Sequence, residues 1–134
     1  QDFHLHEKIA QVHYQLGQYP LALKRLDQVA DKIETSFGVP PKALFQRLLI
    51  FKASVLLKMG QVAPMKDIAL FLVQENTSSA IPYYLLALYE RDFGTLSQSK
   101  IWILQALERE ENIAYRNFLS DIEQKMTEAV EKNK

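Results

Sequence analysis

Three histidines are the residues of this chain best suited to binding a metal or to moving protons. They stand at His4, His6 and His13. In a helix, His4 and His6 point to different sides, because successive residues turn by about 100°. His6 and His13 lie two turns apart, too far to share a metal easily without a third ligand. Ordinary surface or packing roles are therefore favoured for all three.

The other features that could support chemistry are equally sparse. Glu108, Glu110 and Glu111 form an acidic run that is better explained as a solvated helix end than as paired catalytic carboxylates. The absence of cysteine excludes disulfides, zinc–thiolate sites and thiol catalysis, but does not fix the compartment. Each of the four glycines stands alone, so there is no glycine-rich phosphate loop. We therefore predict no catalytic residues, no cofactor and no metal, and a chain that is not an enzyme.

Composition and charge fit a single folded domain that binds neither nucleic acid nor the membrane interior. The 134 residues are 48% apolar, and 16 basic side chains balance 16 acidic ones. A dedicated nucleic-acid surface usually needs a basic excess, and Lys24-Arg25, the only adjacent basic pair, is predicted to lie on a solvated helix face. The most apolar stretch, 44–59, is interrupted by polar and charged residues, so no membrane-spanning segment is expected.

The elements that position these side chains are revealed by a pattern around three glycines, Gly17, Gly60 and Gly94. An alanine stands seven residues before each glycine, and larger apolar or small residues follow at offsets of two, five, nine and twelve. The alanines are Ala10, Ala53 and Ala87, and the residues that follow are Tyr19, Ala22, Leu26 and Val29, then Val62, Met65, Ala69 and Leu72, then Leu96, Ser99, Ile103 and Ala106. A fixed pattern recurring after 43 and 34 residues predicts a repeat array.

Each repeat is interpreted as two antiparallel helices joined by a tight turn. The offsets after the glycine follow one face of a helix, and the alanine before it permits a close helix crossing. The glycine is expected to close the first helix in a left-handed conformation. Pro20 and Pro64 then open the second helices, where proline is tolerated. Pro82 opens the third repeat, after a cap at Ser78 or Ser79.

The pattern predicts an all-α chain of about seven helices and no sheet. They are expected at 3–16, 20–35, 41–59, 63–74, 79–92, 96–108 and 112–131, within one domain comprising repeats at 3–36, 41–76 and 79–110 and a capping helix at 112–131. The capping helix should close the array with one apolar face: Tyr115, Phe118, Leu119, Ile122, Met126 and Ala129 or Val130. Because the chain begins at Gln1 without methionine, we expect a segment of a longer protein.

The alanine–glycine pattern of these three helix pairs resembles that of the tetratricopeptide repeat (TPR) family. Its 34-residue helix pairs carry a Gly-x-aromatic-x-x-Ala turn, which 17–22 matches closely and 60–65 and 94–99 match loosely. The family's early tryptophan is replaced by His6, Leu49 and Tyr83. The resemblance implies a right-handed αα superhelix whose first helices line a concave groove.

The family's activity is binding, and the resemblance implies which residues line the groove. Repeat one would contribute His4, Glu7, Lys8, Gln11 and Tyr14, repeat two Arg47, Ile50, Ser54 and Leu57, and repeat three Tyr84, Leu88, Arg91 and Asp92. Tyr84 and Leu88, four residues apart, are the expected anchors; the alternative is that they are buried between repeats. One TPR branch clamps carboxylate tails with lysine and asparagine, but here the matching positions are Glu7, Gln11, Ile50 and Ser54.

The function predicted from the sequence is therefore a protein-interaction module, an adaptor or chaperone-like array holding a peptide or partner helix. The alternative is a regulatory or sensory domain of a larger transcriptional regulator or signalling protein, which could self-associate into a homo-oligomer. The full-length gene would discriminate between them, because a flanking DNA-binding or catalytic segment favours the regulator.

Overall fold

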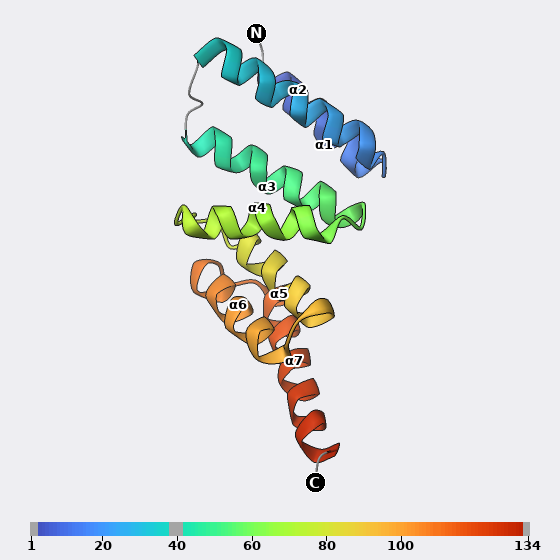
Figure 1. Cartoon of the computed structure of the whole chain (residues 1–134), viewed down its shortest axis with the longest axis vertical. Coiled ribbons are helices and arrows are strands. Elements are labelled where there is room, and N and C mark those ends of the chain that lie inside the picture. Colours follow the sequence, from blue (N-terminus) through green and yellow to red (C-terminus); the bar gives the residue numbers. More distant parts are fainter. Residues whose placement is uncertain (1–2, 38–41, 133–134) are drawn as a thin grey trace. The chain divides into compact units, whose positions relative to one another are not determined.

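In a computed structural model, residues 3–37 and 42–132 are described, and they contain seven helices and no strand. The helices are α1 (Phe3–Gln15), α2 (Tyr19–Phe37), α3 (Lys42–Lys58), α4 (Val62–Gln74), α5 (Ile81–Phe93), α6 (Leu96–Arg109) and α7 (Ile113–Lys132) (Figure 1). The predicted all-α class is confirmed, and each predicted helix end that falls on a described residue lies within two residues of the observed one. The predicted start of the third helix, at residue 41, lies outside the described residues.

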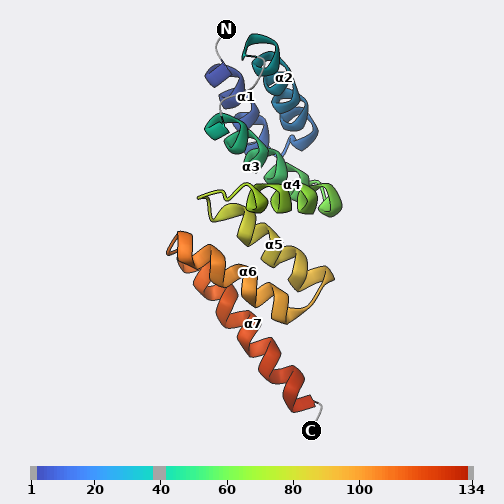
Figure 2. The ribbon, with the colours of Figure 1, turned by 60° about the vertical axis from the view of Figure 1, so that its left-hand side comes forward.

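The chain divides into two compact units, residues 1–68 and 69–134, with the boundary inside α4. The first unit holds α1, α2 and α3. Figures 1 and 2 both show α1 and α2 side by side, running in opposite directions. The second unit holds α5, α6 and α7, which pack against one another (Figure 2). Two predictions depend on how the units are arranged: that the chain is a single domain and that the array follows a superhelix. Both stay predictions.

The repeat pattern identifies the core positions of both units. The alanines Ala10, Ala53 and Ala87 are fully buried. The residues at offsets five, nine and twelve after each glycine are all at most 3% exposed. Those at offset two are half-buried: Tyr19, Val62 and Leu96. The offsets therefore mark the buried face of each second helix, as predicted.

Two of the three glycines end their helices as predicted. Gly17 and Gly60 both have φ of +76°, a conformation that costs little only for glycine. The N–H of Gly17 donates to the Tyr14 carbonyl, and the N–H of Gln18 donates to the His13 carbonyl, at 3.1 and 2.8 Å. This 5→2 and 6→1 pattern is a Schellman motif, which satisfies carbonyls left free at the end of a helix.

Gly94 does not adopt the predicted left-handed conformation, because its φ is −123°. Here the second helix begins by side-chain capping instead: Thr95 Oγ1 accepts from the Gln98 N–H, and the Glu90 carboxylate accepts from the Thr95 N–H. The Glu90 carboxylate lies where a Cβ at residue 94 would stand. The left-handed residue in this part of the chain is Asn76, with φ of +62°, which closes α4 in a Schellman motif of its own.

Two further predictions at helix ends are corrected. The N-cap of α5 is Ala80, whereas Ser79 accepts a hydrogen bond from the Ile81 N–H. On α7 the buried face comprises Tyr115, Phe118, Leu119 and Ile122, with Met126 packed at its edge. Ala129 and Val130 are exposed, because α7 continues past the ends of α5 and α6 (Figures 1 and 2).

Candidate interaction surface

In the first unit, a charge pair joins two of the predicted groove residues across 40 positions of sequence. Arg47 on α3 donates from Nε and Nη2 to the two carboxylate oxygens of Glu7 on α1, at 2.9 and 2.6 Å. The Glu7 side chain is only 9% exposed, whereas that of Arg47 is 58% exposed. The hydrogen bond to Glu7 raises the pKa of Arg47 above its ordinary value. The pair therefore fixes α1 against α3, the first helices of consecutive repeats.

Aromatic packing joins the same two helices. The Tyr14 ring lies edge-on to Phe51 of α3, with centroids 5.7 Å apart, and to Tyr19 of α2 at 5.5 Å. All three pack against the core of the first unit. Tyr14 was predicted to line the groove, and its observed contacts are structural. Phe51 and Tyr19 were not predicted as site residues, because a helical period cannot show which ring meets which.

The remaining predicted residues of this unit stay accessible. On α1, His4, Lys8 and Gln11 are exposed. On α3, Ile50, Ser54 and Leu57 are half-buried, and the Ser54 hydroxyl donates to the Ile50 carbonyl at 3.0 Å. Helical spacing places each set on one stripe, and the Glu7–Arg47 pair joins the two stripes. We call this surface the α1–α3 face: His4, Lys8, Gln11, Arg47, Ile50, Ser54 and Leu57.

In the second unit, the predicted anchors pack against the capping helix. The Tyr84 ring lies 4.9 Å from that of Tyr115 and 5.7 Å from that of Phe118, both on α7. Leu88 is half-buried against the same core cluster. Burial, helped by Glu110 and Tyr84, raises the pKa of Tyr115 above its ordinary value. The capping helix thus covers part of the α5 surface on which a ligand was expected, and a binding role for Tyr84 and Leu88 stays a prediction.

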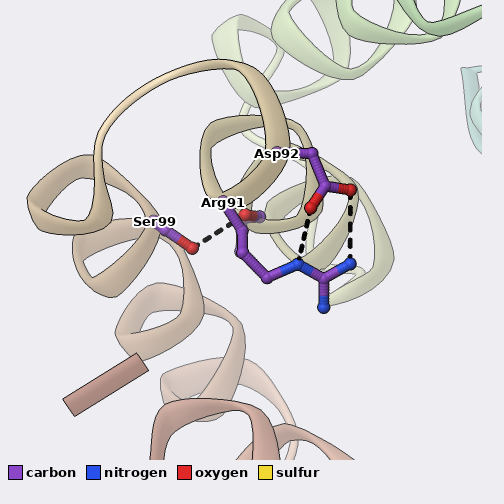
Figure 3. A network of polar contacts seen from close by, with 4 residues as sticks. Arg91, Asp92 and Ser99 are labelled. Carbon is purple, nitrogen blue, oxygen red and sulfur yellow. Dashed lines mark hydrogen bonds and ion pairs between the residues drawn. The ribbon is translucent and has the colours of Figure 1, made fainter. Parts of the chain in front are cut away.

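The two charged candidates of this unit pair with each other. Arg91 donates from Nε to Asp92 Oδ1 at 2.9 Å and from Nη2 to Oδ2 at 3.3 Å (Figure 3). The hydrogen bond to Arg91 lowers the pKa of Asp92 below its ordinary value. The Arg91 guanidinium also lies 5.2 Å from the Phe118 ring centroid, in cation–π range. Nearby, the buried Ser99 hydroxyl donates to the Ala87 carbonyl at 2.8 Å and ties α6 to α5 (Figure 3).

The histidines have packing and surface roles in this structure. His6 lies between Arg25 and Lys32 of α2, and His13 contacts the Gln18 side chain at 2.8 Å. Within the described ranges, no group of three His, Cys, Asp or Glu residues could hold a metal ion. None of the helices described there has the length and apolarity needed to cross a bilayer.

Comparison with protein-family models and with curated protein sequences finds no match. Among solved structures, the first TPR domain of Spaghetti (RPAP3), determined with the HSP90 peptide SRMEEVD bound, is similar to this chain. Its TM-score is 0.75 at 18% identity, over 95% of this chain and 94% of that one. The first TPR domain of human RPAP3 matches with a TM-score of 0.75 at 17% identity, over 94% and 93% of the two chains.

A bacterial protein shows the same likeness. MamA from Desulfovibrio magneticus RS-1 matches with a TM-score of 0.71 at 22% identity, over 94% of this chain and 67% of that one. The similarity therefore extends over nearly the whole chain, through helix pairs as well as the final helix. Together with the buried repeat positions, it establishes that this chain has the tetratricopeptide repeat fold.

Proposed function

We propose that this chain is a protein-interaction module that binds a peptide or a partner helix along the α1–α3 face. The observation that carries the proposal is the Glu7–Arg47 pair, which joins the first helices of two repeats at their predicted inner surfaces. The peptide bound to the similar Spaghetti domain supports this class of activity. An adaptor or chaperone-like role follows from it; the regulatory domain of a larger protein remains the alternative.

The chemistry of the α1–α3 face favours a ligand with apolar anchors and a few acidic or polar groups. Ile50 and Leu57 offer half-buried apolar side chains, while Lys8, Gln11 and Arg47 offer exposed donors. A C-terminal carboxylate is not the expected feature of the ligand. At the positions of the family's carboxylate clamp, Glu7 is itself anionic and already paired, and the Ser54 hydroxyl donates to its own helix.

The proposal can be tested without knowing the partner, by panning a random peptide library against the whole chain. Selected peptides should bind the wild-type protein and lose at least tenfold in affinity to the double variant Lys8→Glu, Gln11→Ala. Both side chains are exposed, so the fold should survive, and circular dichroism would check it. The matched control makes the same kinds of change on α7, Gln124→Ala with Lys125→Glu, where both side chains are also exposed and lie outside the α1–α3 face.

Two results would contradict the proposal. One is that panning enriches no peptide above background, and the other is that the enriched peptides bind the Lys8→Glu, Gln11→Ala variant as tightly as wild type. Loss of binding only with the Gln124→Ala, Lys125→Glu control would move the binding surface to α7.

A further inference from the structure

A second surface of the first unit brings three basic side chains together on α1 and α2. Arg25 Nη1 lies 3.2 Å from His6 Nδ1, and Lys32 Nζ lies 3.1 Å from His6 Nε2. All three side chains are half-buried. Among the described residues, no carboxylate lies within ion-pair distance of Arg25 or Lys32, although Asp27 on the same helix pairs with Lys52. In the part of the chain that the structure describes, the cations of this surface therefore lack a paired carboxylate.

His6 can accept a hydrogen bond from only one of the two cations beside it. A neutral imidazole has one accepting nitrogen, and its other nitrogen carries a proton. Arg25 and Lys32 can only donate, so one of them faces the N–H of His6 and lacks an acceptor there. A carboxylate oxygen placed between these groups would accept from the cation and from the ring. The side chains are half-buried, so water can solvate this cation, and an anionic group of a partner would take the place of that water.

The same surface carries exposed apolar side chains. Arg25 also lines a shallow pocket with His13, Leu21, Lys24 and Gln28, so the basic cluster and the pocket are continuous. Leu21 is 49% exposed. Next to His13 on α1, Val12 and Leu16 are 53% and 66% exposed, and they share one side of the helix because they are four residues apart. An apolar edge therefore borders the basic one.

We propose that this surface, the α1–α2 face, docks an acidic amphipathic helix of a partner protein. The apolar side of that helix would cover Val12, Leu16 and Leu21. Its carboxylates would reach Arg25, Lys32 and His6 and supply the missing acceptor. A helix fits better than an extended chain, because the apolar and basic edges each run along helices and a partner helix presents matching stripes. This face adjoins the α1–α3 face along α1, where Val12 lies one helical turn from Lys8.

Fluorescence anisotropy can test this with three labelled synthetic peptides of about 18 residues, long enough to form several helical turns. The first carries leucine on one helical face and glutamate on the other. The second replaces each glutamate with lysine. The third keeps the first composition in shuffled order, so that no face is apolar. Only the first should bind the full chain, and its affinity should fall as salt rises, since exposed charges are screened.

Variants then locate the peptide on the protein. Neutralising both cations, with Arg25→Gln and Lys32→Gln, should weaken binding at least tenfold, and Leu16→Ser should weaken it at least threefold. The double variant Gln124→Ala, Lys125→Glu on α7, where both side chains are exposed, should change it less than twofold. Unchanged far-ultraviolet circular dichroism and melting temperature would show that all variants fold.

Several outcomes would overturn the proposal. One is that the acidic peptide binds the folded Arg25→Gln, Lys32→Gln variant as tightly as wild type, and another is that it does not bind the wild type. Equal binding of the shuffled peptide would indicate unspecific attraction of polyanions. Concentration-dependent dimers in sedimentation velocity, abolished by Leu16→Ser, would show that a second copy covers the surface instead. None of these outcomes bears on the α1–α3 face, so the two proposals fail separately.

Discussion

The Glu7–Arg47 pair predicts an asymmetry that a double-mutant cycle can measure. The carboxylate is nearly buried and the guanidinium is largely exposed, so removing either partner has different consequences. Arg47→Met would leave an anion with little access to water, whereas Glu7→Gln would leave an arginine that water can solvate. Glutamine and methionine have helix propensities close to those of the residues replaced. The changes should therefore report on the pair and not on the helices.

The magnitude follows from the geometry. Charges about 2.6 Å apart attract by about 1.6 kcal/mol in a water-like dielectric, and severalfold more in a dielectric of about 20. The exposure of Arg47 favours the lower value, and fixing its side chain costs entropy. We expect a coupling free energy of about 1–2 kcal/mol. Arg47→Met should cost about 2 kcal/mol because it leaves a poorly solvated charge, and Glu7→Gln, which keeps an acceptor, about 1 kcal/mol.

Urea denaturation of the wild type, both single variants and the double variant would give the four free energies of unfolding. The expected result is that Arg47→Met destabilises more than Glu7→Gln, with coupling that weakens only partly in high salt. A coupling below about 0.3 kcal/mol, the level of an exposed pair, would refute the argument. So would a larger cost for Glu7→Gln than for Arg47→Met.

Four other substitutions test the fold and the site. Ala53→Leu should overpack a fully buried position and cost about 1–3 kcal/mol, whereas Ala43→Leu, exposed on the same helix, should be nearly neutral in thermal denaturation; equal melting points would show that Ala53 is not at a crossing. Gly60→Ala should cost about 1–2 kcal/mol because of its positive φ, and no loss in urea denaturation would contradict the left-handed turn. Tyr84→Ala should lower the free energy of unfolding by about 2–4 kcal/mol through lost packing on α7. An unchanged melting temperature would show that this packing does not stabilise the fold, which would favour a ligand-binding role for Tyr84. Asp92→Asn should cost less than about 1 kcal/mol at pH 7. Because the pKa of Asp92 is lowered from 3.8 in the folded chain, its contribution is present above that value and lost as pH falls through the lowered pKa. The difference from wild type should therefore shrink as pH falls below 3.8, and a difference that does not shrink would contradict the pairing.

The fold was largely predictable because the information lies in local spacing. The alanine and the residues at offsets five, nine and twelve from each glycine are buried in all three repeats, since helical period and close crossing both restrict side-chain size. Glycine alone did not identify the backbone conformation, however. Gly94 precedes a side-chain cap at Thr95 and has no need of a positive φ, whereas Asn76 adopts one and carries a weaker sequence signal than glycine.

The candidate site was predictable only in part, because its contacts link residues far apart in sequence. The positions of Glu7 and Arg47 within their repeats predicted that both lie on inner helix faces. Those positions could not show that the two side chains pair, nor that the carboxylate is therefore buried. Likewise, the amphipathic pattern of α7 predicted a cap, but not that its aromatic rings meet Tyr84. The basic cluster of the α1–α2 face had a detectable signal: Leu21, Arg25, Gln28 and Lys32 follow one helical stripe.

The most direct test of the proposed function is a map of ligand contacts by nuclear magnetic resonance. A peptide selected by panning would be titrated into the isotopically labelled chain, and backbone amide shifts would be followed. We predict that the largest changes occur on the α1–α3 face, at Lys8 and Gln11 of α1 and at Ile50 and Ser54 of α3. Changes confined to other surfaces, with these four amides unaffected at saturation, would contradict binding along the α1–α3 face.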